Sequence, residues 1–146
     1  MAKDKIQHPS KDVLIQLNEL HPFTGLYSIF KDRPLTIDVK SRVIIPSELR
    51  LVLKYRNNTR DGRPENILLY ITTAEEFRVP YVLITDCLGG LRIDPEKTFP
   101  EEMDKEGRIN LRRQVKDAGL EGKIIFYGAE NHIRVYSASN WEKYRE

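Results

Sequence analysis

The sequence predicts a mainly β protein with short helices (α+β), in which two similar β-α-β units share one compact, pseudo-symmetric domain. First, short runs rich in Val, Ile, Leu and Tyr alternate with short amphipathic segments. Second, the stretches 37–50 and 103–116, which start 66 residues apart, resemble each other without gaps. Third, 146 residues of 40% hydrophobic composition suffice for one domain of ordinary size.

The first half should begin with a solvated tail and a short amphipathic helix. Ser10 is suited to cap that helix, and Pro22 to stop it. Pro46 stands at the start of the next helix, a position that proline tolerates. The elements expected here are helix 10–20, strands 25–30, 35–38 and 42–46, helix 47–55, a loop at 56–66, and strands 66–73 and 79–86.

The second half should begin with a connection. Gly89-Gly90 and the acidic, proline-containing segment IDPEKTFPEEM are typical of connecting chain. Gly119 is suited to end a short helix, and Trp141 should pack from the last helix into the core or a subunit interface. The elements expected after the connection are strand 108–111, helix 112–118, the hairpin strands 123–128 and 132–137, and helix 140–146.

The internal repeat places an Asp-x-x-x-Arg motif in each half. Asp38 aligns with Asp104, and Arg42 aligns with Arg108. Each Asp can pair with the Arg across a hairpin base, or can accept bonds from the backbone N–H groups of the turn. As a surface ion pair such a unit stabilises by only about 0–1 kcal/mol. A rigid turn that carries Lys and Arg is also suited to contact DNA phosphates and groove edges, and both interpretations stay open.

The charge is unevenly distributed along a chain whose net charge is only +2. Residues 31–64 hold nine Lys or Arg against four acids, whereas residues 94–106 hold six acids against two Lys. This asymmetry indicates either a basic face or head-to-tail contact between basic and acidic surfaces of neighbouring copies.

Catalytic and metal chemistry find little support in the sequence. Cys87 is the single cysteine, which excludes an internal disulfide; we expect it to be small and buried. His8, His21 and His132 lack partners at ligand spacing, so no metal and no cofactor is expected. No nucleophile elbow or phosphate loop is present, and we expect a non-enzyme. The start of the chain lacks an apolar signal core, which favours the cytoplasm.

The motifs FTGLY, IDVKSRVIIPSELR, MDKEGRI, AGLEGKIIFYG and IRVYSASNWEKY together resemble the MraZ family. MraZ proteins are two-repeat members of the AbrB-like (SpoVT-like), swapped-hairpin class of bacterial transcription regulators. The resemblance covers about residues 23–146 and is most specific in the doubled Asp-x-x-x-Arg motif and the final Trp. It implies two tandem AbrB-like β-α-β repeats, 23–92 and 93–146, that form a double-ψ-like β-barrel domain after an N-terminal tail and short helix at 1–22.

The resemblance also implies a partner and a site. The partner is double-stranded DNA, bound at short direct repeats in a promoter of the division and cell-wall gene cluster by a ring-like homo-oligomer at the nucleoid. The expected DNA-binding residues are Lys40, Ser41, Arg42, Arg50, Lys105, Arg108, Arg112, Arg113 and Lys116. The expected structural residues of the turns are Asp38, Asp104 and Gly107.

The sequence departs from the family pattern in several features, and two of them are single positions. Ser41 stands where the first turn of the family has Gly, so the geometry of that turn is expected to differ from the second. Arg134 stands where the family ending has Glu. A second function therefore stays open, namely an oligomeric protein-interaction module of the same fold that does not bind DNA.

Overall fold

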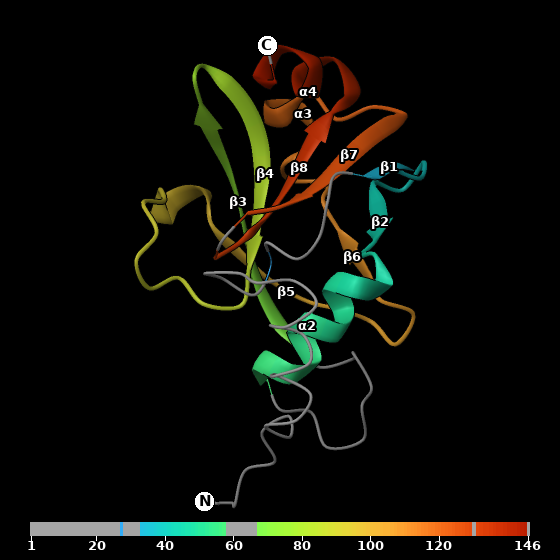
Figure 1. Ribbon diagram of the computed structural model, residues 1–146, viewed down its shortest axis with the longest axis vertical. Helices are drawn as coiled ribbons and strands as arrows, with labels where there is room; N and C mark the ends of the chain where they lie inside the picture. Colours follow the sequence, from blue (N-terminus) through green and yellow to red (C-terminus); the bar gives the residue numbers. More distant parts are fainter. Residues whose placement is uncertain (1–26, 28–32, 58–66, 130, 146) are drawn as a thin grey trace, which may run out of the picture.

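The computed structural model describes Tyr27 and residues 33–57, 67–129 and 131–145, and Figure 1 shows their arrangement. The strands of this part of the chain are β1 (Arg33–Thr36), β2 (Arg42–Ile44), β3 (Leu68–Glu76), β4 (Val79–Thr85), β5 (Phe99–Glu102), β6 (Arg108–Asn110), β7 (Lys123–Gly128) and β8 (Ile133–Ser137). Its helices are α2 (Ser47–Asn57), α3 (Val115–Ala118) and α4 (Ala138–Tyr144), with a short 3-10 turn at Pro95–Lys97. The prediction of a mainly β chain with short helices is confirmed.

Six strands pair antiparallel in the order β1-β7-β8-β4-β3-β5. Strands β2 and β6 pair with each other as a separate antiparallel ribbon. In Figure 1 this ribbon lies to the right of the sheet, between β1 above and α2 below. Within the described residues the pairing order is open at β1 and β5, so it does not include the closure expected of a double-ψ-like barrel.

Both faces of the large sheet are covered, which explains why the β4 sequence VPYVLIT is apolar up to its last residue, Thr85. Val82 and Ile84 point into the main core, to which α2 contributes Leu49, Val52 and Leu53. Tyr81 and Leu83 alternate with them and belong to a second cluster that also contains Trp141 of α4. The prediction that Trp141 packs is confirmed, because its side chain is buried in this second cluster.

The predicted elements differ from the observed ones in several places. Strand β1 begins and ends two residues before the predicted 35–38. Strand β5 lies inside the segment predicted to be a connection, and it pairs with β3 at the edge of the sheet. An edge strand tolerates Pro100 and charged residues, which is why its sequence resembled a loop. Strand β3 runs to Glu76, so β3 and β4 are joined by a turn of two residues at positive φ, Phe77 and Arg78.

Other predictions have mixed outcomes. The hairpin of β7 and β8, the end of α3 at a left-handed Gly119, and the start of α2 after Pro46 are confirmed. The prediction of a buried Cys87 is wrong, because its side chain is exposed just beyond the end of β4. Helix 10–20, strand 25–30 apart from Tyr27, and most of the loop 56–66 lie outside the described residues.

Candidate functional site

The first Asp-x-x-x-Arg motif forms a turn, the first turn (residues 38–42), in which Asp38 binds both backbone and side chain. One carboxylate oxygen of Asp38, Oδ1, accepts from the backbone N–H groups of Lys40 at 2.9 Å and Arg42 at 2.8 Å. The other, Oδ2, accepts from Nε of Arg42 at 2.9 Å. The Arg42 backbone N–H is the main cause that lowers the pKa of Asp38, so this carboxylate is ionised at neutral pH.

The second motif forms the second turn (residues 104–108) with the same set of bonds. Oδ1 of Asp104 accepts from the N–H groups of Glu106 at 2.9 Å and Arg108 at 2.8 Å, and Oδ2 accepts from Nε of Arg108 at 2.8 Å. Desolvation of Asp104 acts to raise its pKa, but the hydrogen bonds from Arg108 outweigh it and lower the pKa. In both turns the Nε bond fixes the direction of a guanidinium that is about one-third exposed, 33% for Arg42 and 34% for Arg108.

Ser41 and Gly107 hold equivalent left-handed positions in the two turns, with φ of 63° and 84°. The N–H of Ser41 donates to Asp38 O at 3.0 Å, and the N–H of Gly107 donates to Asp104 O at 2.9 Å. The expected difference in turn geometry is therefore wrong, since Ser41 adopts the conformation that glycine would have. Gly107 has its own reason to be glycine, because a Cβ there would lie 2.4 Å from Cδ of Arg50.

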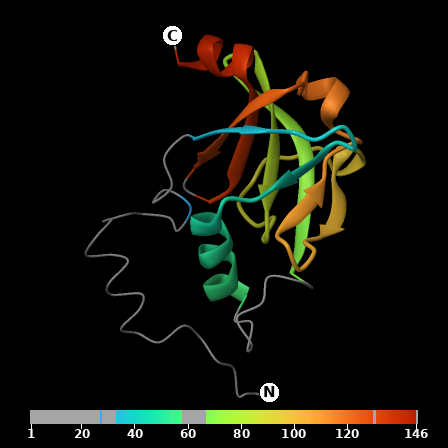
Figure 2. The same cartoon turned by 90° about the vertical axis from the view of Figure 1, so that its right-hand side faces the viewer.

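The β2–β6 ribbon connects the two turns. Val43 pairs with Ile109 at its centre. The N–H of Ile45, after β2, donates to O of Gly107 at 2.9 Å, and the N–H of Leu111, after β6, donates to O of Ser41 at 2.8 Å. The second turn is thus bonded to the residue after β2, and the first turn is bonded to the residue after β6. The turns consequently lie at opposite ends of one ribbon, which faces the viewer in Figure 2.

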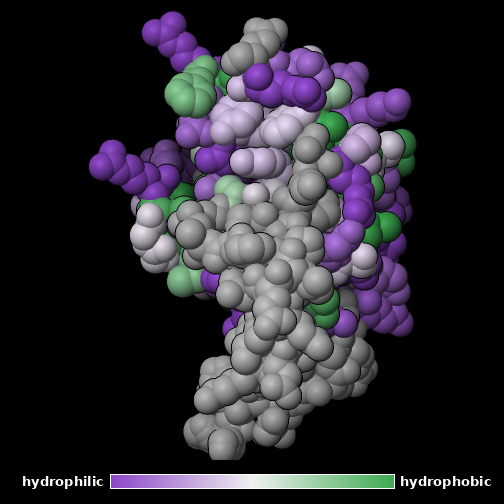
Figure 3. Space-filling view, in the orientation of Figure 1, coloured by the Kyte–Doolittle hydropathy of each residue, from purple (hydrophilic) through white to green (hydrophobic). Residues whose placement is uncertain are grey.

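The two turns differ in charge. Arg108 Nη2 also donates to Oε1 of Glu106 at 3.1 Å, so two carboxylates balance the second guanidinium. Lys40 occupies the equivalent place in the first turn and adds a positive charge instead. Val39, at the first turn's tip, is fully exposed. On the side of the molecule seen in Figure 3, hydrophobic residues are scattered among hydrophilic ones.

The structure brings some of the other predicted residues to the ribbon. Arg50 of α2 crosses the second turn, and its Nη1 lies 3.5 Å from O of Glu106. Arg112 is exposed just beyond β6, and its N–H is bonded to Oδ1 of Asn110. Lys116 is exposed on α3. Arg113 is exposed too, but its guanidinium stacks over the ring of Phe99 at 4.5 Å, on the β5 side.

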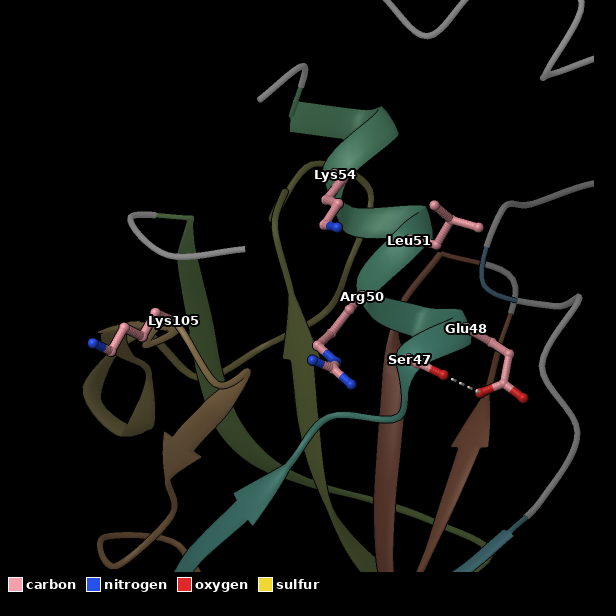
Figure 4. A pocket seen from close by; sticks show the side chains of 6 residues that line it. All are labelled: Ser47, Glu48, Arg50, Leu51, Lys54 and Lys105. Atoms are coloured by element: carbon pink, nitrogen blue, oxygen red, sulfur yellow. Dashed lines mark hydrogen bonds between the residues drawn. The ribbon is translucent and has the colours of Figure 1, made fainter. Parts of the chain in front are cut away.

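Two clefts flank the ribbon. One, of about 260 Å³, is lined by Leu35, Thr36, Asp38, Arg42, Ile44 and Arg108, so it joins both motif arginines. The other, the α2 cleft, has a volume of about 380 Å³ and is shown in Figure 4. Its lining residues are Ser47, Glu48, Arg50, Leu51, Lys54 and Lys105. Sequence reasoning missed Lys54, although its position four residues after Arg50 on a helix indicated a shared face.

Arg134, the second departure from the family pattern, lies away from the ribbon in a network on the α4 side of the sheet. Its Nη1 donates to Oε1 of Glu76 at 2.6 Å and to the hydroxyl of Tyr136 at 3.0 Å. Its Nε donates to Nε2 of His132 at 2.9 Å. Burial of the His132 ring is the main cause that lowers the pKa of His132 to about 4, and the positive charge of the nearby Arg134 is the second cause. The role of Arg134 in this network is structural.

The described residues include no group of three or more His, Cys, Asp or Glu side chains arranged to hold a metal. None of their helices is long and apolar enough to cross a membrane.

Comparison with known proteins gives one consistent result. The family model of the MraZ protein matches residues 97–146. The chain is 30% identical over 117 residues to the transcriptional regulator MraZ of Limosilactobacillus reuteri, covering 75% of this chain and 81% of the relative. It is 32% identical over 119 residues to that of Thermoanaerobacter pseudethanolicus, with 75% and 80% covered. It is 26% identical over 117 residues to that of Natranaerobius thermophilus, with 76% and 82% covered.

Proposed function

This chain belongs to the MraZ family of transcriptional regulators, and on that premise we propose that it binds DNA in a sequence-specific manner. The proposed target is a set of short direct repeats in the promoter of the division and cell-wall gene cluster. The division of residues 23–146 into two AbrB-like repeats, 23–92 and 93–146, is part of this proposal, as are an oligomeric state and a location at the nucleoid in the cytoplasm.

One observation carries the proposal, namely the two arginines held in the same way at the two ends of one ribbon. Asp38 and Asp104 each bond the turn backbone and the Nε of the following arginine. A guanidinium held at Nε keeps its outer nitrogens as donors, in the fork that matches guanine O6 and N7 or a phosphate, although Nη2 of Arg108 already donates to Glu106. A two-stranded β-ribbon also fits the major groove of B-DNA.

We assign different roles to the residues of the ribbon. Arg42 and Arg108, with Lys40 and Lys105 beside them, are the proposed contacts to bases and nearby phosphates, and Ser41 supports them by holding the first turn closed. The proposed supporting contacts to phosphate are Arg50, Arg112, Arg113 and Lys116. Among these Arg113 is the weakest candidate, because its guanidinium already stacks on Phe99.

One copy of the chain offers few contacts to DNA. Each turn has only two or three cations, and Glu106 offsets one of them in the second turn. Several copies, in a ring-like homo-oligomer, would present equivalent turns to successive repeats. Such an arrangement raises the overall affinity by effective concentration, without any new contact.

A protein-interaction module without DNA binding is the second candidate. The Arg108–Glu106 pair favours it, because it leaves the second turn close to neutral. The two functions differ in how they respond to DNA sequence and salt. A DNA reader prefers its operator and loses affinity steeply as salt rises. An interaction module binds neither duplex.

The test is a titration of the purified chain with two duplexes by fluorescence anisotropy. One duplex is the region upstream of the chain's own gene, and the other is a scrambled sequence of the same composition. We expect tighter binding to the upstream duplex by about a thousandfold or more at physiological salt. Equal affinities for the two duplexes would refute sequence-specific binding. No binding to either duplex, together with early elution from heparin, would refute the proposal and favour the interaction module.

A further inference from the structure

The α2 cleft is lined by three cations, and one hydrogen-bond donor among them, Nε of Arg50, has no acceptor among the described residues. Nε of Arg50 is buried and makes no hydrogen bond among the described residues. Its Nη1 has only a long contact, 3.5 Å, to O of Glu106. A buried guanidinium N–H without an acceptor is costly in free energy, and such a group calls for an explanation such as a missing ligand.

The position of Arg50 is set by the residues around it. Its side chain passes over Gly107, where a Cβ would lie 2.4 Å from Cδ and 3.0 Å from Nε. In Figure 4, Arg50 and Lys54 project from the same side of α2, and Lys105 lies on the second turn with its amino group directed away from them. Arg50, Lys54 and Lys105 all line the cleft.

The single acid of the α2 cleft does not neutralise these cations. Glu48 accepts a hydrogen bond from Ser47 Oγ at 3.3 Å and from Arg33 Nη1 at 3.1 Å. In Figure 4 its carboxylate points away from Arg50 and Lys54. The hydrogen bond from Arg33 is the main cause that lowers the pKa of Glu48, so its charge is already matched. The cleft keeps an excess of positive charge.

At the opposite end of the ribbon, the positions that correspond to the three cations of the α2 cleft do not carry the same charges. The positions 66 residues away from the three cations hold Lys116, the buried Leu120 and the fully exposed Val39. Lys54 thus corresponds to a buried core residue, Leu120, and Lys105 corresponds to an exposed apolar residue, Val39. The extra positive charge of the α2 cleft therefore comes from Arg50 and Lys54 of α2, because the second turn by itself is close to neutral.

We propose that the α2 cleft binds one phosphate group of the DNA backbone, with Arg50 as the buried donor and Lys54 and Lys105 as the other cations of its lining. This inference rests on the proposed function and adds an asymmetry to it. The end of the ribbon at the second turn is anchored to the backbone independently of sequence, and the end at the first turn depends on its base contacts. Lys54 becomes a DNA contact that the repeat pattern did not predict.

The main test compares Lys54→Ala with Lys143→Ala, a matched change of an exposed lysine on α4, at the far end of the molecule in Figure 1. Affinities for the upstream and scrambled duplexes are measured from 50 to 200 mM salt. Lys54→Ala should weaken binding to both duplexes by the same factor and reduce the slope of log K against log salt by about 0.9. The ratio of wild-type to variant affinity should accordingly fall about threefold across this salt range. Lys143→Ala should match the wild type.

A second measurement observes the cleft without DNA. Inorganic phosphate is titrated into the labelled chain, and the Nε–H resonance of Arg50 is followed by NMR, with Arg50→Lys to assign it. We expect this resonance to shift with phosphate and to shift less in Lys54→Ala. No shift would overturn the inference of an anion site.

The outcomes with DNA separate this inference from the proposed function. If the wild type prefers the upstream duplex but Lys54→Ala keeps the wild-type affinity and salt slope, the cleft inference is wrong and the proposed function stands. If phosphate shifts Arg50 while the salt slope stays unchanged, the cleft binds free phosphate and the DNA contact is refuted. If the wild type binds no DNA, both are refuted.

Discussion

Gly107→Ala perturbs the second turn in a way whose cost can be worked out from the structure. Alanine at φ of 84° is strained by about 1–2 kcal/mol. The new Cβ would also lie 2.4 Å from Cδ of Arg50, a contact that forces the side chain to move. Moving Arg50 adds about 1 kcal/mol, because its long side chain can shift but is partly enclosed. We therefore expect a loss of about 2–3 kcal/mol in the free energy of unfolding.

The assay is urea denaturation followed by tryptophan fluorescence, since Trp141 is buried. A double-mutant cycle with Arg50→Ala separates the two terms. Removing Arg50 should restore about 1 kcal/mol of the loss caused by Gly107→Ala and leave the backbone strain. Ser41→Gly, at the equivalent position, should change stability by less than about 1 kcal/mol, because relief of strain is offset by a more flexible unfolded chain. If Gly107→Ala unfolds at the wild-type midpoint, or if Arg50→Ala gives no rescue, the reasoning is refuted.

Two further predictions concern the network around Arg134. Glu76→Gln should lower the free energy of unfolding by about 2 kcal/mol, because Arg134 Nη1 and the Tyr144 hydroxyl both donate to this carboxylate. The control is Glu75→Gln, and equal melting temperatures for the two variants would contradict this prediction. The pKa of His132 is lowered from 6.5 to about 4, so the fold favours the neutral ring. This preference for the neutral ring stabilises the fold above pH 6.5. As the pH falls from 6.5 toward 4, the free energy of unfolding should decrease by about 3 kcal/mol. In urea denaturation across this range His132→Gln should lose less stability than the wild type; parallel profiles would contradict the assignment.

The local chemistry of the turns could be predicted from the sequence. Asp can cap a turn and can bind Arg four residues later, and these are the bonds that both turns contain. The error at Ser41 came from expecting that the higher cost of a positive φ for serine than for glycine would change the geometry of the turn. A serine reaches φ of 63° here because the ribbon bond from Leu111 and the bonds to Asp38 hold the turn closed.

The long-range arrangement could not be predicted in the same way. Nothing in either motif indicates that β2 pairs with β6, because that pairing joins segments far apart in the chain. The edge position of β5 was hidden by Pro100 and by its acids, which are features of loops and of protected edges alike. The α2 cleft could not be predicted either, since Arg50 and Lys105 line one cleft only because α2 lies beside the second turn.

The central claim is that Arg42 is a reader of DNA sequence, and one titration tests it most directly. Arg42→Ala and the control Lys143→Ala are compared with the wild type on the upstream and scrambled duplexes at one salt concentration. The Arg42–Asp38 pair is largely exposed to solvent and contributes little to stability, so the variant should remain folded. We predict that Arg42→Ala lowers the ratio of the two affinities by about tenfold or more, while Lys143→Ala leaves it unchanged. An unchanged ratio in folded Arg42→Ala would contradict the account.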